Sequence, residues 1–210
     1  MTNFATLNTA LPTSQDAVTL RNGIFLAASR TYGETYIEPM IRRVLGLNKP
    51  NGGDHDAVDI ASGEKYEIKS AKVLTSRAKL GDSASSLFDV IATQANADPL
   101  SRIISFKDRK EAVYDANIQN VKRDHFDKLI YNLLYAEGIA VFCISSDDIS
   151  KENIPNWSDK HGRYDALGKS GQFNIKNGTI VLHEQKYALK FLSWEELVPF
   201  YKDINEKDSN

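Results

Sequence analysis

Three charged residues, Asp56, Glu67 and Lys69, occur in a pattern that could hydrolyse a phosphodiester bond. Carboxylates bind divalent cations such as Mg²⁺ through oxygen, and a nearby ammonium group can stabilise negative charge on a phosphate. Two short strand-like segments carry these residues, and Ser62-Gly63 separates the segments. The sequence therefore predicts a β-hairpin with strands over Asp56–Ala61 and Lys65–Ala71.

The turn of this hairpin decides which aspartate lies beside Glu67. Side chains alternate between the two faces of a strand, so Glu67 and Lys69 share a face. With a two-residue turn, Asp56 lies opposite Lys69 and diagonal to Glu67, within roughly 8 Å. A turn one residue longer would instead pair Asp59 with Glu67. We expect Asp56 to be the metal ligand, and Asp59 remains the alternative.

Three more carboxylates lie close to the hairpin in the sequence. Glu34 and Glu38 are four residues apart on a predicted helix, so they share a face. Asp54 precedes the first strand. Each of the three is either a surface group or an additional carboxylate of the metal site.

The segments Asp56-Ala-Val-Asp59 and Tyr66-Glu-Ile-Lys-Ser70, joined by a short glycine-containing turn, resemble the active-site hairpin of the PvuII family of restriction endonucleases. This family belongs to the PD-(D/E)xK nuclease superfamily. The resemblance implies Asp56, Glu67 and Lys69 as catalytic residues, and Asp56, Glu67 and Ile68 as the positions that bind Mg²⁺. The family reads bases with a pair of adjacent histidines soon after the hairpin. Residues 71–95 contain no histidine, so the recognition sequence does not follow from the resemblance.

This resemblance implies a type II restriction enzyme that cuts double-stranded DNA at a specific sequence, without an organic cofactor. Because a palindromic site matches a two-fold symmetric protein, a homodimer is expected. Two alternatives remain open. One is a repair or recombination nuclease of the same superfamily that reads DNA structure, and the other is a non-catalytic DNA-binding module that keeps the fold.

Two other stretches contain candidates for DNA contacts. Basic residues gather after Glu67, and the segment 150–178 is polar, contains glycine and carries side chains that can bind base edges. From these stretches we predict contacts by Lys72, Arg77, Arg163, Lys169, Ser170, Gln172 and Asn174.

The composition fits one globular domain. The chain has 210 residues, 41% of them hydrophobic, and a formal net charge of −2, so any DNA-binding surface must be locally basic. A single cysteine excludes an intrachain disulfide. No apolar run has the length of a membrane span, and the amino terminus does not look like a signal peptide. We expect a cytoplasmic protein.

The predicted elements place the hairpin in a mixed α/β sheet flanked by helices, as in a restriction-endonuclease-like core. We expect a loose amino-terminal arm over residues 1–15 and a single nuclease domain over residues 16–205. Helical periodicity covers Ala17–Leu47, with a kink or a break into two helices at Pro39 and a helix stop at Gly46. It also covers Ser83–Ala95 and His125–Glu137. Strands are expected over Glu111–Ile118, Ile139–Ile144, Thr179–His183 and Tyr187–Phe191. A capping box at Ser193–Glu196 predicts a final helix.

Overall fold

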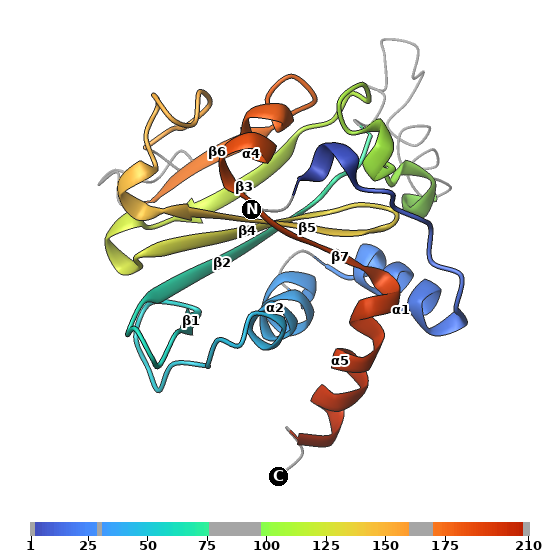
Figure 1. Ribbon diagram of the computed structural model, residues 1–210, viewed down its shortest axis with the longest axis horizontal. Coiled ribbons are helices and arrows are strands. Elements are labelled where there is room, and N and C mark those ends of the chain that lie inside the picture. Colours follow the sequence, from blue (N-terminus) through green and yellow to red (C-terminus); the bar gives the residue numbers. More distant parts are fainter. Residues whose placement is uncertain (1–2, 29–30, 76–97, 160–169, 208–210) are drawn as a thin grey trace, which may run out of the picture.

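The computed structural model describes residues 3–28, 31–75, 98–159 and 170–207 (Figure 1). Within these ranges, five strands form a mixed main sheet in the order β1-β2-β4-β5-β7, and two strands form a small antiparallel sheet, β3-β6. Strands β2 and β4 run parallel, and the other neighbours in the main sheet are antiparallel. The expected mixed α/β architecture with flanking helices is confirmed.

The elements have the following bounds. The strands are β1 (Ala57–Val58), β2 (Lys65–Lys72), β3 (Ala116–Val121), β4 (Lys128–Leu134), β5 (Gly138–Ser145), β6 (Gly171–Ile175) and β7 (Ala188–Ser193). The α-helices are α1 (Gln15–Leu26), α2 (Glu38–Val44), α4 (Ile180–Tyr187) and α5 (Trp194–Lys207), and a π-helix covers Thr31–Ile37. Short 3₁₀ turns cover Phe4–Thr6, Pro99–Arg102, Phe106–Asp108, Arg123–His125 and Ser146–Asp148.

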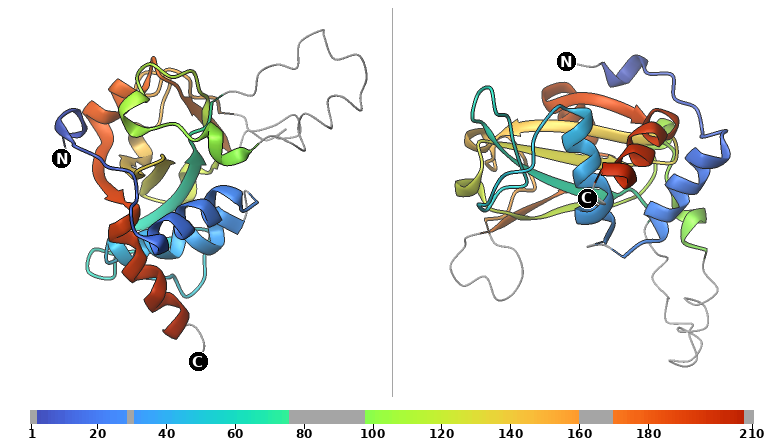
Figure 2. Two further views of the ribbon diagram at one scale, coloured as in Figure 1. Left: turned by 90° about the vertical axis from the view of Figure 1, so that its right-hand side faces the viewer. Right: turned by 90° about the horizontal axis from the view of Figure 1, so that it is seen from below.

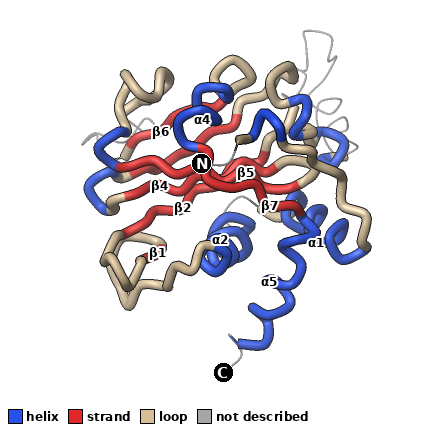
Figure 3. Tube along the Cα trace, in the orientation of Figure 1, coloured by secondary structure: helices blue, strands red, loops and turns tan. Residues whose placement is uncertain are grey.

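The main sheet lies between two layers (Figures 2 and 3). Helices α1, α2 and α5 pack on one face, and the β3-β6 sheet with α4 covers the other. A separate hydrophobic core lies on each face of the main sheet, and strand β4 contributes side chains to both of them. Ile130 and Leu134 pack with the helices, whereas Leu129 and Tyr131 pack with the small sheet. A strand buried on both faces is apolar at nearly every position, because side chains alternate across it.

The helix predicted over His125–Glu137 is wrong, because most of that segment is strand β4. Apolar residues at three- and four-residue spacing occur there because both faces of the strand are filled, so the helical periodicity is accidental. The strand predicted over Thr179–His183 is also wrong, since this segment opens α4. The strands expected around β3, β5 and β7 are present with shifted ends. The helix expected over Ser83–Ala95 lies outside the described residues.

Three predicted helix boundaries are confirmed. Gly46 adopts a φ of 69° just after α2, a conformation that favours glycine. Pro39 lies in the first turn of α2, where a missing N–H costs nothing. The Ser193 N–H donates to the Glu196 carboxylate at 2.8 Å, and the Glu196 N–H donates to Ser193 Oγ at 3.3 Å, which is a reciprocal capping box. Among the described residues, no helix has the length and apolar character that crossing a membrane requires.

The amino-terminal arm is packed onto the domain, which corrects the expectation of a loose segment. Phe4 is 2% exposed and makes edge-to-face contacts with Phe106 and Phe142. Arg109 Nη2 donates to the main-chain carbonyl of Phe4 at 3.1 Å. Farther along the arm, the Ser14 hydroxyl donates to the Glu195 carboxylate at 2.5 Å. An aromatic anchor and these polar contacts hold the arm in place.

Stability is expected to fall in mild acid because of His183. This residue is 1% exposed, its Nδ1 lies 2.8 Å from the Tyr131 hydroxyl, and burial lowers its pKa from 6.5 to about 4. Below pH 6.5, therefore, His183 binds a proton in the unfolded chain. In the folded chain it stays neutral until the pH approaches 4. The free energy of unfolding should drop across this window by up to about 3 kcal/mol.

Denaturant unfolding at pH 7 and pH 4.5 tests this expectation. In His183→Phe the aromatic packing is kept but no proton can bind, so the loss between the two pH values should shrink. The variant also removes the partner of Tyr131, which lowers stability at both pH values by about 1–2 kcal/mol. An unchanged pH dependence in His183→Phe would assign the acid sensitivity to other groups.

Candidate active site

The hairpin has a longer turn than predicted, and the register moves by two residues. Ala57 pairs with Tyr66, Val58 pairs with Lys65, and the Asp56 N–H donates to the Tyr66 carbonyl at 2.9 Å, so Asp56 lies beside Tyr66 and not opposite Lys69. The two-residue turn is therefore wrong. A shift of two residues preserves the face to which every side chain points. Asp56 consequently stays on the same face as Glu67, as expected.

Asp59 belongs to the turn. Its N–H donates to the Glu64 carbonyl at 3.0 Å, and its carboxylate accepts the Ala61 N–H at 2.8 Å. This hydrogen bond holds the pKa of the Asp59 carboxyl below its usual value. Gly63 closes the turn with a φ of 74°. The side chain of Asp59 is used to stabilise the turn, so the geometry favours Asp56 over Asp59 as the aspartate of the site.

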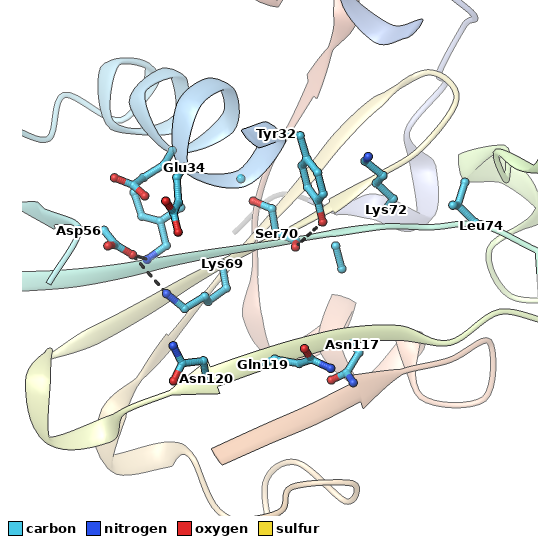
Figure 4. A pocket seen from close by; sticks show the side chains of 14 residues that line it. Tyr32, Glu34, Asp56, Lys69, Ser70, Lys72, Leu74, Asn117, Gln119 and Asn120 are labelled. Atoms are coloured by element: carbon cyan, nitrogen blue, oxygen red, sulfur yellow. Dashed lines mark hydrogen bonds and ion pairs between the residues drawn. The ribbon is translucent and has the colours of Figure 1, made fainter. Parts of the chain in front are cut away.

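The side chains of Asp56, Glu67 and Lys69 converge (Figure 4). Lys69 Nζ lies 3.5 Å from Asp56 Oδ2 and forms a shorter ion pair with Glu67 Oε1. Burial raises the pKa of the Glu67 carboxyl, while the Lys69 ammonium opposes this rise and Asp56 adds to it. For Lys69, burial alone would lower the pKa, but the charges of Glu67 and Asp56 raise it overall. The result is a cation held between two carboxylates.

The edge of β2 completes the arrangement. Strand β1 pairs only with Lys65 and Tyr66, so the rest of β2 extends beyond it. The Ile68 N–H donates to Asp56 Oδ2 at 2.8 Å, which fixes that carboxylate against the strand. The N–H and C=O of one residue point to the same side of a strand, so the Ile68 carbonyl also faces this edge. Ile68 can therefore contribute a main-chain oxygen beside Asp56.

Helix α2 braces the hairpin. Arg42 Nη1 donates to the main-chain carbonyl of Asp56 at 3.0 Å and also forms an ion pair with Glu38. Burial, and next the charge of Asp56, raises the pKa of Glu38 to about 7, although Arg42 and Lys69 act in the opposite direction. Glu38 and the exposed Glu34 both line the cleft beside Asp56. Asp54 is exposed and lies 3.5 Å from His125 Nδ1, away from this group.

An open cleft of about 820 Å³ is lined by Asp56, Lys69, Glu34 and Glu38. One wall is formed by the segment around Tyr32 and Glu38, the floor by β2 from Ile68 to Lys72, and the other wall by β3. The Tyr32 hydroxyl donates to the Ser70 carbonyl at 2.9 Å on the edge of β2 (Figure 4). Lys69 extends from β2 into this cleft. A phosphate that entered the cleft would meet the Lys69 ammonium and the Asp56 carboxylate, while Glu67 lies buried behind them in contact with Lys69.

Comparisons with known proteins add no assignment. No protein-family model matches the sequence, and no curated protein matches it significantly.

The donor set fits Mg²⁺. Among the described residues, no three His, Cys, Asp or Glu side chains gather closely enough to form a metal site by themselves. Asp56 and Glu67 nevertheless share one cation, the ammonium of Lys69, which marks the point where two carboxylate oxygens converge. Together with the main-chain oxygen of Ile68 they offer three hard oxygen ligands, and Mg²⁺ usually completes its shell with water and phosphate oxygens.

The predicted DNA contacts fall into three groups. Arg77, Arg163 and Lys169 lie outside the described residues. Gln172 and Asn174 lie on β6, with half-buried side chains on the face opposite its core residues, and Ser170 directly precedes this strand. The segment 150–178, expected to be irregular, thus contains a regular strand. Lys72 lines the cleft.

The ammonium of Lys72, however, is directed at helix α1. Lys72 Nζ donates to the carbonyls of Phe25 at 3.1 Å and Ala27 at 2.6 Å, and lies 4.1 Å from the centre of the Tyr32 ring. A cation at these carbonyls caps the carboxyl end of the helix. Burial lowers the pKa of Lys72 to about 8. These contacts favour a structural role over the DNA contact that we predicted for this lysine.

Replacing Lys72 by Met should therefore lower the free energy of unfolding by about 1–3 kcal/mol, because two charge-assisted hydrogen bonds are lost. DNA affinity at fixed salt should change little. Lys65→Met, an exposed lysine of the same strand, is the matched control and should leave stability unchanged. If Lys72→Met weakens DNA binding without loss of stability, the original prediction of a DNA contact is right.

The residues that sequence reasoning missed are on β3. Asn117, Gln119 and Asn120 line the cleft, and none of them was a candidate. The available signal was a run of amide side chains at and just beyond the end of the strand predicted over Glu111–Ile118. That signal was incomplete, because only the pairing of β3 with β6 places the strand across the cleft from β2.

Proposed function

We propose that this protein is a Mg²⁺-dependent endonuclease that hydrolyses phosphodiester bonds of double-stranded DNA, with a fold of the restriction-endonuclease type. One observation carries the proposal. Asp56 and Glu67 converge on the ammonium of Lys69 where β2 extends beyond β1, and Asp56 and Lys69 line an open cleft. Such a group of side chains can bind a divalent cation and hydrolyse a phosphodiester, and the hairpin that carries it resembles that of the PvuII family.

Each residue has a role that follows from its position. Asp56 and Glu67, with the Ile68 carbonyl, would hold the metal ion at the edge of β2. Bound there, Mg²⁺ supplies stabilisation for the negative charge that develops on the phosphate oxygens. Lys69 orients the attacking water and stabilises the same charge from the strand side. Water attacks phosphorus in line, a new P–O bond forms, and the bond to the leaving oxygen breaks.

Supercoiled plasmid DNA incubated with the protein and Mg²⁺ tests the proposal. Discrete linear fragments are expected from a sequence-specific enzyme, and a smear would indicate the less specific repair or recombination nuclease. Ca²⁺, which tolerates irregular oxygen shells, should support DNA binding with little cleavage. Cleavage that persists in excess chelator, or no cleavage by folded protein with Mg²⁺ or Mn²⁺, would contradict the proposal.

A homodimer is part of the proposed function, because two active sites related by two-fold symmetry cut both strands of a palindromic site. Light scattering on the purified protein, alone and with duplex DNA in Ca²⁺, measures this directly. A monomer in both conditions would favour an enzyme that nicks one strand at a time.

A further inference from the structure

The two walls of the cleft differ in chemistry. On one side lie the carboxylates of the helical segment and the catalytic hairpin. On the other side β3 contributes Asn117, Gln119 and Asn120 to the cleft, which are all amides (Figure 4). Among the residues of β3 that line the cleft, none carries a charge. This wall therefore lacks the charged groups that dominate the sequence-independent attraction to phosphate, and offers neutral donors and acceptors instead.

A β-bulge aims two of these amides into the cleft. Ile118 and Val121 both point into the core and both have partners on β6, but the register between them shifts by one residue. The extra residue leaves Gln119 and Asn120 both outside the core, where a regular strand would bury one of them. Asn120 adopts a φ of 57°, a left-handed conformation that asparagine accepts more readily than most residues, which allows the bulge to form.

The third amide has an unused acceptor. Asn117 Oδ1 is buried and has no hydrogen-bond partner within the described part of the chain. Buried polar atoms are nearly always hydrogen-bonded, and a turn of the Asn117 side chain toward the cleft would let Oδ1 accept a hydrogen bond from a ligand. Asn117 also pairs across the small sheet with Asn174, whose side chain lies on the same face. The amide surface therefore continues from β3 onto β6.

The chemistry of this surface matches a base edge. An amide offers one acceptor and two donors side by side, and adenine presents the complementary N6–H donor and N7 acceptor in the major groove. A two-stranded antiparallel ribbon such as β3-β6 is also one of the shapes that the major groove admits. The catalytic edge of β2 and this ribbon face the same cleft, so bases could be read beside the phosphate that is cut.

We propose that the amides of β3, with Gln119 as the principal contact and Asn117 and Asn120 as its neighbours, read adenine in the major groove and determine the specificity of the enzyme. This inference rests on the proposed function and adds the class of base that is recognised. It assigns specificity to a strand far in sequence from the catalytic hairpin.

Selection from a pool of duplexes with a randomised central segment, in the presence of Ca²⁺, provides the first test. The protein should enrich a motif that contains adenine. Replacing that adenine by 7-deazaadenine removes the N7 acceptor alone, and should weaken binding by roughly ten- to hundredfold. Gln119→Ala should lose a similar factor on the natural motif and show no further loss with 7-deazaadenine.

Two controls keep the test specific. Gln185→Ala removes an exposed amide of α4 that does not line the cleft, and should bind like the parent. Asn120→Gly removes an amide while keeping a residue that accepts the positive φ, so any effect reflects the side chain. Stability of each variant is checked by thermal unfolding.

A motif without adenine, or undiminished discrimination against 7-deazaadenine in Gln119→Ala, Asn117→Ala and Asn120→Gly alike, would overturn the inference. If the protein still cut plasmid DNA with Mg²⁺ in that case, the proposed nuclease function would stand and only the reading strand would be wrong. If the protein neither cut DNA nor selected any sequence, both the proposed nuclease function and the inference about β3 would be contradicted.

Discussion

Asp56→Asn is expected to lower the rate of DNA cleavage by at least about a thousandfold, because it removes a charged metal ligand at the point where phosphate charge is stabilised. The fold should survive. The amide oxygen of the variant can still accept the hydrogen bond from the Ile68 N–H, which Asp56 Oδ2 accepts at 2.8 Å. Initial rates on plasmid DNA at saturating Mg²⁺, with thermal unfolding as a check on folding, measure the effect.

Asp59→Asn is the matched control, three residues away in the same hairpin. Its amide oxygen can still accept the Ala61 N–H that stabilises the turn, so cleavage should remain within a few-fold of the parent. Loss of cleavage in Asp59→Asn combined with an active Asp56→Asn would show that the wrong aspartate has been assigned. Equal loss in both variants would mean that the turn itself is required.

Lys69→Met is expected to lower cleavage by about 10²–10³-fold, since a cation aimed at the developing phosphate charge is lost. Metal affinity should behave differently. The Lys69 ammonium contacts both Asp56 and Glu67, so it competes with any divalent cation for the same oxygens. Calorimetric titration with Ca²⁺ should therefore show affinity that is equal to or tighter than that of the parent, while catalysis is nearly lost.

The same variant has a consequence for stability. Without Lys69, the carboxyl of Glu67, which is 7% exposed, loses its ion-pair partner, and its pKa should rise further. We expect the free energy of unfolding to fall by about 1–3 kcal/mol without metal and to recover when Ca²⁺ is added. Lys65→Met, on the same face of β2 but exposed, should change neither quantity. A parallel loss of metal affinity and cleavage in Lys69→Met would contradict the competition that we infer.

The alternation of residues along β2 could be predicted from the sequence. Glu67 and Lys69 share a face because their spacing is two, and this holds for any partner strand. The predicted turn was too short, but the register differs from the predicted one by two residues. Because this number is even, each side chain keeps its face, and Asp56 remains the aspartate near Glu67. Local spacing thus determined which groups could meet, although not the pairing that brings them together.

Strand β4 shows what local patterns could not decide. Its apolar residues fit a helix as well as a strand, and only the neighbours β2 and β5, which pair with it on both sides, make it the centre of the sheet. Phe4 likewise lies in a polar segment that predicts no structure, yet its ring finishes an aromatic cluster formed by distant residues. Burial of this kind depends on long-range packing, which no short window of sequence contains.

The sequence by itself determined the chemistry of the hairpin, because Asp56, Glu67 and Lys69 lie within one local unit whose geometry follows from strand alternation. Only the tertiary structure decided that the edge of β2 is uncovered, that Lys72 caps α1, and that the amides of β3 face the catalytic edge. The physical reason is the same in each case. These features arise from contacts between segments far apart in the chain, and such contacts are selected by the packing of the whole domain.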